Sequence, residues 1–106
     1  MNALCRLTLL ASFLFSGNLY AATYDIIMKN REFSQTEIMI NRGDSIRFLN
    51  AEENTEHNLF SLSKVYPFEI SQQLPGIDVT IPFRKGGSFE VECAIHPTMH
   101  LRVMVK

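Results

Sequence analysis

The chain has 106 residues, with ten Lys and Arg against eleven Asp and Glu, and a formal net charge of −1. This length fits one ordinary domain, because single domains usually contain about 100–200 residues. The nearly neutral charge gives no reason to expect nucleic acid or an anionic membrane surface as a partner.

Residues 1–22 differ in composition from the rest of the chain. Arg6 is their only charge, residues 7–15 are an almost continuous apolar run, and residues 16–22 are small and polar. This is the layout of a secretory signal peptide, with cleavage after Ala21 or Ala22. The run is too short for a membrane helix, which needs about 20 residues. We therefore expect a cleavable signal peptide in residues 1–22, one domain in residues 23–106, export to the periplasm and no membrane insertion after cleavage.

From residue 23 onward, short apolar runs are separated by turn residues, which is typical of an all-β sandwich or barrel. Residues 41–44 form a turn in which Gly43 is free to take a positive φ. Residues 51–56 are too polar for a core strand and indicate a loop, while residues 72–76 and 84–87 indicate connections. We expect seven to eight strands in a Greek-key β-sandwich. The segments are residues 24–28, 37–40, 45–50, 57–61, 68–70, 78–83, 88–93 and 101–105.

The last two of these strands alternate clearly between apolar and polar residues. Phe89, Val91 and Cys93 share one face of the first, which places Cys93 on the core side at the strand's end. Residues 101–105 resume the alternation after a short loop. The two strands can be antiparallel neighbours, which would fix both ends of the loop.

Cys93 is the only cysteine outside the leader, which contains Cys5. Small exported proteins usually pair their cysteines in disulfides. A lone thiol in an oxidising compartment is a liability unless something occupies it. The alternative is a buried, inert cysteine that behaves as a small hydrophobe.

Cys93, His96 and Met99 lie in one loop with the spacing C-x-x-H-x-x-M, and His57 supplies a further imidazole from the middle of the chain. One thiolate, two imidazoles and a weak axial thioether form the blue-copper arrangement. We therefore predict one copper ion bound by His57, Cys93, His96 and Met99. Binding needs ionised Cys and neutral His, so it should release a proton.

Each ligand also has a simpler interpretation. His57 in a polar loop could be a surface histidine, Met99 a core residue and Pro97 a turn former. Zinc also binds Cys and His, but Met99 is a poor zinc ligand. The joint occurrence of these residues with a lone cysteine favours copper. Alternation turns His100 outward, as a surface residue or as part of a second, weaker copper site.

These motifs resemble the cupredoxins, small periplasmic or lumenal blue copper proteins that include plastocyanin, pseudoazurin and amicyanin. The resemblance covers residues 23–106 and rests on Glu56-His57-Asn58, on residues 85–89 and on residues 93–99. The short loop with Pro97 directly after the histidine is most similar to amicyanin. The resemblance implies an eight-stranded Greek-key sandwich with copper at one end, and a backbone hydrogen bond from Asn58 to the Cys93 sulfur.

The expected function is a periplasmic one-electron carrier that is a monomer and meets protein redox partners. Ala94, Ile95, Pro97 and Met99 could form an apolar patch around His96 for a brief contact with a partner. Glu52, Glu53 and Glu56 either steer a basic partner or are simply a solvated loop.

The alternative function is copper tolerance, storage or delivery, for which His100, Met104 and Met28 are a thin supply of extra ligands. An enzyme is not expected. Copper oxidases and nitrite reductases need further His-rich centres, and three histidines in total leave at most one beyond the predicted site.

Overall fold

The computed structural model of the chain describes residues 20–106, so the predicted signal peptide lies almost entirely outside the described residues. Within residues 20–106 every regular element is a strand, and no helix long and apolar enough to cross a membrane is present. The all-β prediction is confirmed. The strands are β1 (Thr23–Lys29), β2 (Glu32–Phe33), β3 (Glu37–Ile40), β4 (Ser45–Asn50), β5 (His57–Ser61), β6 (Phe68–Gln73), β7 (Asp78–Pro82), β8 (Gly87–Cys93) and β9 (His100–Val105).

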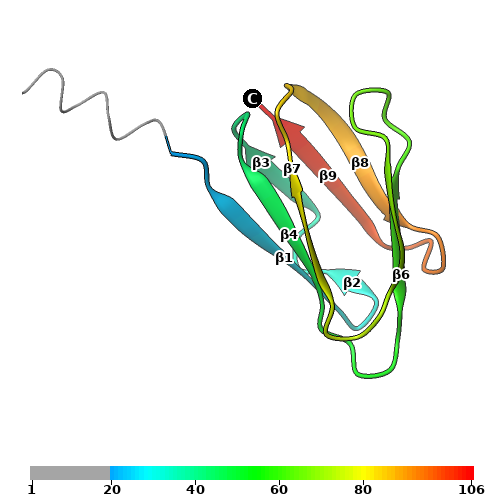
Figure 1. Cartoon of the computed structure of the whole chain (residues 1–106). Coiled ribbons are helices and arrows are strands. Elements are labelled where there is room, and N and C mark those ends of the chain that lie inside the picture. The colour runs from blue at the N-terminus through cyan, green and yellow to red at the C-terminus, as the bar shows by residue number, and fades with distance from the viewer. Residues whose placement is uncertain (1–19) are drawn as a thin grey trace, which may run out of the picture.

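The strands form two sheets that face each other as a sandwich (Figure 1). One sheet has the order β2-β1-β4-β7 and the other the order β3-β9-β8-β5-β6. The pairs β1–β4 and β3–β9 are parallel, and the other paired strands are antiparallel. Parallel neighbours cannot be joined by a tight hairpin. The chain therefore crosses between the two sheets.

Two details differ from the sequence prediction. Residues 20–106 contain nine strands because the two-residue β2, which pairs with the end of β1, is too short to show a period in sequence. β6 continues to Gln73, so the connection expected at residues 72–76 begins later. β6 reaches Gln73 through a bulge. His57 of β5 pairs with Gln73 and Leu59 pairs with Ile70, which leaves one extra residue on β6. Within the bulge, Gln72 has a positive φ of 49°. Bulges of this kind are common next to functional sites.

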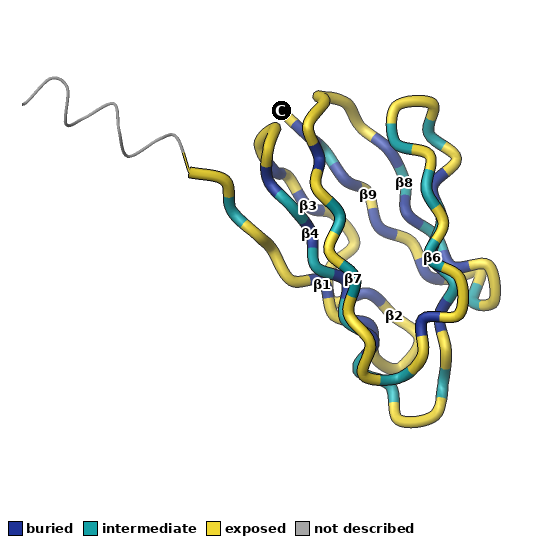
Figure 2. The backbone as a smooth tube through the Cα atoms, in the orientation of Figure 1, coloured by how far each residue is buried: buried dark blue, intermediate teal, exposed yellow. Residues whose placement is uncertain are grey.

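The core lies between the sheets and is built from the inward side chains of alternating strands. Along β4 and β9, buried residues alternate with more exposed ones; Figure 2 colours the burial of each described residue along the backbone. Phe48 and Phe83 are fully buried. Removing one such side chain from water stabilises the fold by about 1.5–3 kcal/mol. The alternation predicted from sequence therefore describes the packing of the sandwich.

β8 and β9 are antiparallel neighbours from Gly87 opposite Val105 to Glu92 opposite His100, as the sequence led us to expect. The loop of residues 94–99 thus connects two paired strands, and it projects at one end of the sandwich beside β6 (Figure 1). β5 lies on the other side of β8, with Leu59 opposite Cys93. This arrangement brings the start of β5 next to the end of β8.

Candidate metal centre

The end of β8 and the start of β5 carry two of the predicted ligands. Cys93 is the last residue of β8 and is 2% exposed. His57 is the first residue of β5 and is completely buried, so the interpretation as a surface histidine is wrong. Both side chains point inward because His57, Leu59 and Cys93 lie on the core faces of paired strands. Their proximity follows directly from the β5–β8 pairing.

His96 reaches the same place from the loop. The amide of Met99 donates a hydrogen bond to the carbonyl of His96 at 3.0 Å, which closes a turn around Pro97. Because proline fixes its own φ, this turn has little freedom. His96 is half-buried, with its Nδ1 directed at the other two ligands.

The three donor atoms form a compact triangle. His57 Nδ1 and His96 Nδ1 are 3.2 Å apart, and the Cys93 Sγ is 3.7 Å from the first and 3.6 Å from the second. Zinc, a first-row ion comparable in size to copper, binds imidazole nitrogen at about 2.0 Å and thiolate at about 2.3 Å. Angles of about 105–120° between such bonds put the nitrogens about 3.2 Å apart and nitrogen about 3.6 Å from sulfur. The residues therefore fit one metal ion.

Met99 is the fourth predicted ligand, and it is 1% exposed at the end of the same loop. Its backbone is tied to His96 by the turn described above. A buried thioether is compatible with an axial ligand and also with an ordinary core residue. The structure thus excludes Met99 from the apolar surface patch in which the sequence analysis included it.

A backbone hydrogen bond reaches the sulfur. The amide of Asn58 donates to the Cys93 Sγ at 3.4 Å, and the carbonyl of Asn58 accepts from Ala94 at 2.9 Å. This donor helps to hold the Cys93 sulfur in place, and the thiolate is the form of cysteine that binds metal. The contact is the one that the resemblance to cupredoxins implied.

Glu52 lies against the far side of the His57 ring, which sequence analysis did not predict. Its Oε2 is 3.1 Å from His57 Nε2, and its carboxylate also accepts hydrogen bonds from the amides of Asn30 and Arg31. Burial acts to raise the pKa of Glu52, but the Arg31 and Asn30 amides and His57 outweigh it and hold the pKa below its usual value. Glu52 is therefore turned inward, whereas Glu53 and Glu56 are exposed.

The environment of His57 favours a neutral ring. Burial lowers its pKa below the ordinary 6.5; Glu52 opposes that change and His96 adds to it, and the net direction is downward. A neutral imidazole has one protonated nitrogen and one free lone pair. The lowered pKa therefore favours, at neutral pH, the form of His57 that a metal ligand requires.

His100 is outside the triangle. It is the first residue of β9, its side chain is 51% exposed, and its Nε2 lies 2.7 Å from Glu90 Oε2. Within residues 20–106, the group of side chains close enough to hold a metal consists of His57, Cys93 and His96. The outward orientation predicted for His100 is confirmed.

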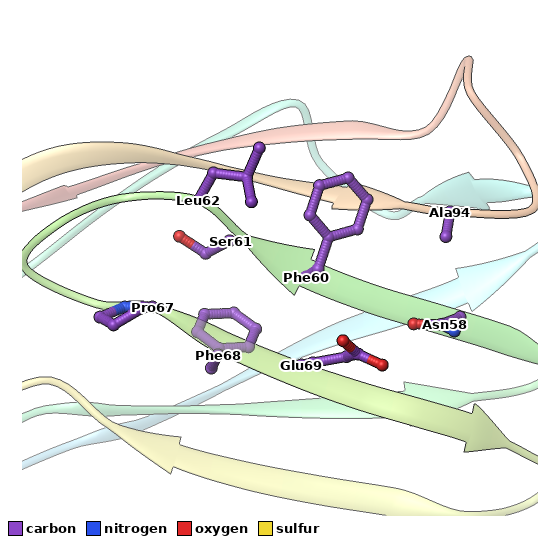
Figure 3. Close-up of a pocket in the computed structure, with 8 residues that line it drawn as sticks. All are labelled: Asn58, Phe60, Ser61, Leu62, Pro67, Phe68, Glu69 and Ala94. Carbon is purple, nitrogen blue, oxygen red and sulfur yellow. The ribbon is translucent and has the colours of Figure 1, made fainter.

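The surface beside the site is partly apolar. Ala94, Ile95 and Pro97 are exposed around the half-buried His96. A hollow of about 440 Å³ runs along β5 and β6 and ends at Ala94; Figure 3 shows the side chains that line it. Ala94 therefore belongs both to the hollow and to the exposed loop.

No protein-family model and no curated protein sequence matches this chain. Solved structures match its fold. A proline-to-glycine variant of amicyanin in a reduced Cu(I) form aligns with a TM-score of 0.73 at 17% identity, covering 85% of this chain and 88% of that one. A purple cupredoxin from Nitrosopumilus maritimus aligns with a TM-score of 0.68 at 19% identity over 78% of this chain and 99% of that one.

A Cu-containing nitrite reductase from Thermus scotoductus SA-01 aligns with a TM-score of 0.74 at 21% identity over 79% of this chain. The aligned part is only 22% of the reductase chain, so this likeness concerns one part of a larger protein. The resemblance inferred from the sequence motifs is confirmed at the level of the fold. With its two-sheet sandwich and a His-Cys-His-Met set at one end, the chain has the cupredoxin fold and the ligand set of a blue copper site.

Proposed function

We propose that the protein is a type 1 copper protein that carries single electrons between protein partners. The observation that supports this most is the triangle of His57, Cys93 and His96 donor atoms, which two paired strands and the loop after them place at the spacing of one metal ion. Copper bound there would supply one-electron redox chemistry between Cu(I) and Cu(II).

The chain's own contribution is a rigid setting. Cys93 ends a strand that is paired on both sides, by β5 and by β9. His96 is fixed by the turn around Pro97, and the Asn58 amide supports the sulfur. Ligands held in this way change position little when the charge of the site changes, which favours fast electron transfer. His96 is the ligand nearest to the surface, so it is the natural route for the electron.

The test is the absorption spectrum of the Cu(II)-loaded protein. A strong visible band from thiolate-to-copper charge transfer is expected, and Cys93→Ser should abolish it. His100→Ala is the matched control, because His100 lies outside the triangle, and it should leave the band unchanged. A colourless Cu(II) complex of the wild-type protein would contradict the proposal.

Copper tolerance, storage or delivery is the alternative expected from the sequence. Of the extra ligands named for it, Met28 is fully buried in the core and His100 is paired with Glu90. These contacts give the alternative less support than electron transfer.

We also propose that the chain is exported to the periplasm as a monomer, with cleavage after Ala21. The Ala22 amide donates to Asp44 Oδ1 at 2.9 Å, and the Ala22 carbonyl accepts from Ser45 at 2.9 Å. Cleavage after Ala21 would give Ala22 a charged amino group beside that carboxylate, whereas cleavage after Ala22 would remove both contacts.

Two measurements test this. Expression in a bacterial host with cell fractionation should place the protein in the periplasm, and the intact mass should correspond to a chain that begins at Ala22. A mass for a chain beginning at Thr23, or for the full chain, would contradict the proposed cleavage. Sedimentation of the purified protein tests the monomer.

A further inference from the structure

Glu52 joins three parts of the chain at one carboxylate. Its Oε1 accepts from the amide of Asn30 and its Oε2 from the amide of Arg31, both at 2.9 Å, and Oε2 also lies 3.1 Å from His57 Nε2. The side chain is only 10% exposed. Its backbone amide donates to Asn50 Oδ1 at 3.0 Å, so the main chain of Glu52 is held as well. A carboxylate held at this many points has little freedom to rotate.

The two amides belong to the tight turn between β1 and β2, where Lys29 pairs with Glu32. Asn30 and Arg31 have φ values of 53° and 57°, as a two-residue type I′ hairpin turn requires. Asn tolerates this left-handed conformation well, but for an ordinary residue such as Arg31 it is unfavourable. The two charge-assisted hydrogen bonds to Glu52 compensate for that cost. The turn and the carboxylate therefore hold each other in place.

This arrangement determines where the proton of His57 lies. Backbone amides can only donate, so the Glu52 oxygens act as acceptors. In the contact with His57 the ring must then donate from Nε2. A neutral ring with its proton on Nε2 has its lone pair on Nδ1. Nδ1 is the atom that faces Cys93 Sγ and His96 Nδ1.

We propose that Glu52, held by the β1–β2 turn, is a positioning residue that fixes the tautomer and ring orientation of His57 before any metal binds. The inference deepens the proposed metal site, on which it rests. A carboxylate behind a ligand histidine orients the ring and makes it more basic, and losing such a partner typically lowers metal affinity about 10–100-fold. The assigned role is thus one that the strand pairing of β5 alone would not supply.

The first test measures the tautomer in the metal-free protein at pH 8. Long-range ¹H–¹⁵N correlation spectra distinguish a protonated ring nitrogen from one with a free lone pair. His57 should be protonated at Nε2 in the wild type. In Glu52→Gln the side-chain amide can place its NH₂ group against Nε2, so a substantial fraction of the other tautomer should appear. Glu53→Gln is the control, because it makes the same change on an exposed neighbour, and it should match the wild type.

The second test measures affinity by competition for Cu(I) with a chromogenic chelator. Glu52→Ala and Glu52→Gln should bind about 10–100-fold more weakly than the wild type, and Glu53→Gln should bind equally well. Thermal unfolding verifies that each variant is folded. A wild-type His57 protonated at Nδ1 overturns the proposal even if no variant folds, and so does a Glu52→Gln variant that keeps both tautomer and affinity. The tautomer requires no copper, so a wild-type protein without a blue band would refute the proposed function and leave this inference standing.

Discussion

Replacement of Asn50 by Ala should destabilise the fold strongly, even though Asn50 binds no metal. Asn50 is fully buried at the end of β4. Its Nδ2 donates to the carbonyls of Gln73 at 2.8 Å and Thr55 at 2.9 Å, and its Oδ1 accepts from the amide of Glu52 at 3.0 Å. One side chain therefore connects β4, the loop of residues 51–56 and the end of β6.

The expected loss follows from what the truncation leaves without a partner. A buried polar group that loses its hydrogen bond costs about 1–3 kcal/mol. The bond to Gln73 is fully buried and should cost the upper part of that range, whereas water can reach Thr55 and Glu52 and reduce their cost. The sum is about 2–4 kcal/mol. A domain of this size has a free energy of unfolding of only about 5–15 kcal/mol.

The assay is urea unfolding of the metal-free protein, in which the midpoint should fall and the slope should stay constant. At about 4–8 °C per kcal/mol, the thermal midpoint should drop by at least 8 °C or so. Asn50→Asp should cost at least as much, because it keeps the acceptor for Glu52 but directs a carboxylate oxygen at two carbonyls. Asn54→Ala, an exposed change in the same loop, should stay within about 0.5 kcal/mol. If Asn50→Ala costs less than about 1 kcal/mol, the reasoning from unsatisfied carbonyls is wrong.

Three further changes test the axial ligand, the proposed contact surface and the acid stability of the fold. Met99→Leu nearly conserves volume, so it should lower the free energy of unfolding by less than about 1.5 kcal/mol. If the thioether is an axial ligand, the same change should raise the reduction potential of the copper-loaded protein. An unchanged potential would show that Met99 is a core residue and not a ligand. Ile95→Lys should slow electron self-exchange without altering the visible band, because a charge then enters the proposed contact surface. Hydrogen bonds from the amides of Ala22 and Asn41 hold the pKa of Asp44 below 3.8. The stabilisation by Asp44 is therefore present above pH 3.8 and lost as the pH falls through the lower, folded-state pKa. In Asp44→Asn, the thermal unfolding midpoint should fall less steeply at acid pH than it does in the wild type.

Local patterns predicted most of the scaffold. The alternation in residues 45–50 and 88–93 matches β4 and the greater part of β8, and the polar segment before His57 is a loop. Period-two patterns are reliable where one strand face is buried, because a slip of one residue would expose every core side chain. The two-residue β2 and the bulge opposite β5 escaped prediction, since both are set by the partner strand.

The candidate site was likewise predicted only in part. The spacing of Cys93, His96 and Met99 is local, so the sequence alone indicated these three ligands. Glu52 could not be identified as the partner of His57, because its orientation depends on amides 21 and 22 residues earlier in the chain. In sequence it looked like one member of an acidic loop beside Glu53. Its inward position is a consequence of the turn that holds it.

The two nitrogens of the His57 ring contact residues from both sheets of the sandwich. His57 belongs to β5 in the five-stranded sheet, and its Nδ1 faces Cys93 and His96 of the same sheet and its loop. Its Nε2 faces Glu52, which follows β4 and is held by the β1–β2 turn, both in the four-stranded sheet. Any shift of one sheet against the other would therefore rotate or translate the ring relative to the remaining ligands. The packing that stabilises the sandwich thus also fixes the geometry of the candidate metal centre, which is what the proposed electron transfer with little rearrangement requires.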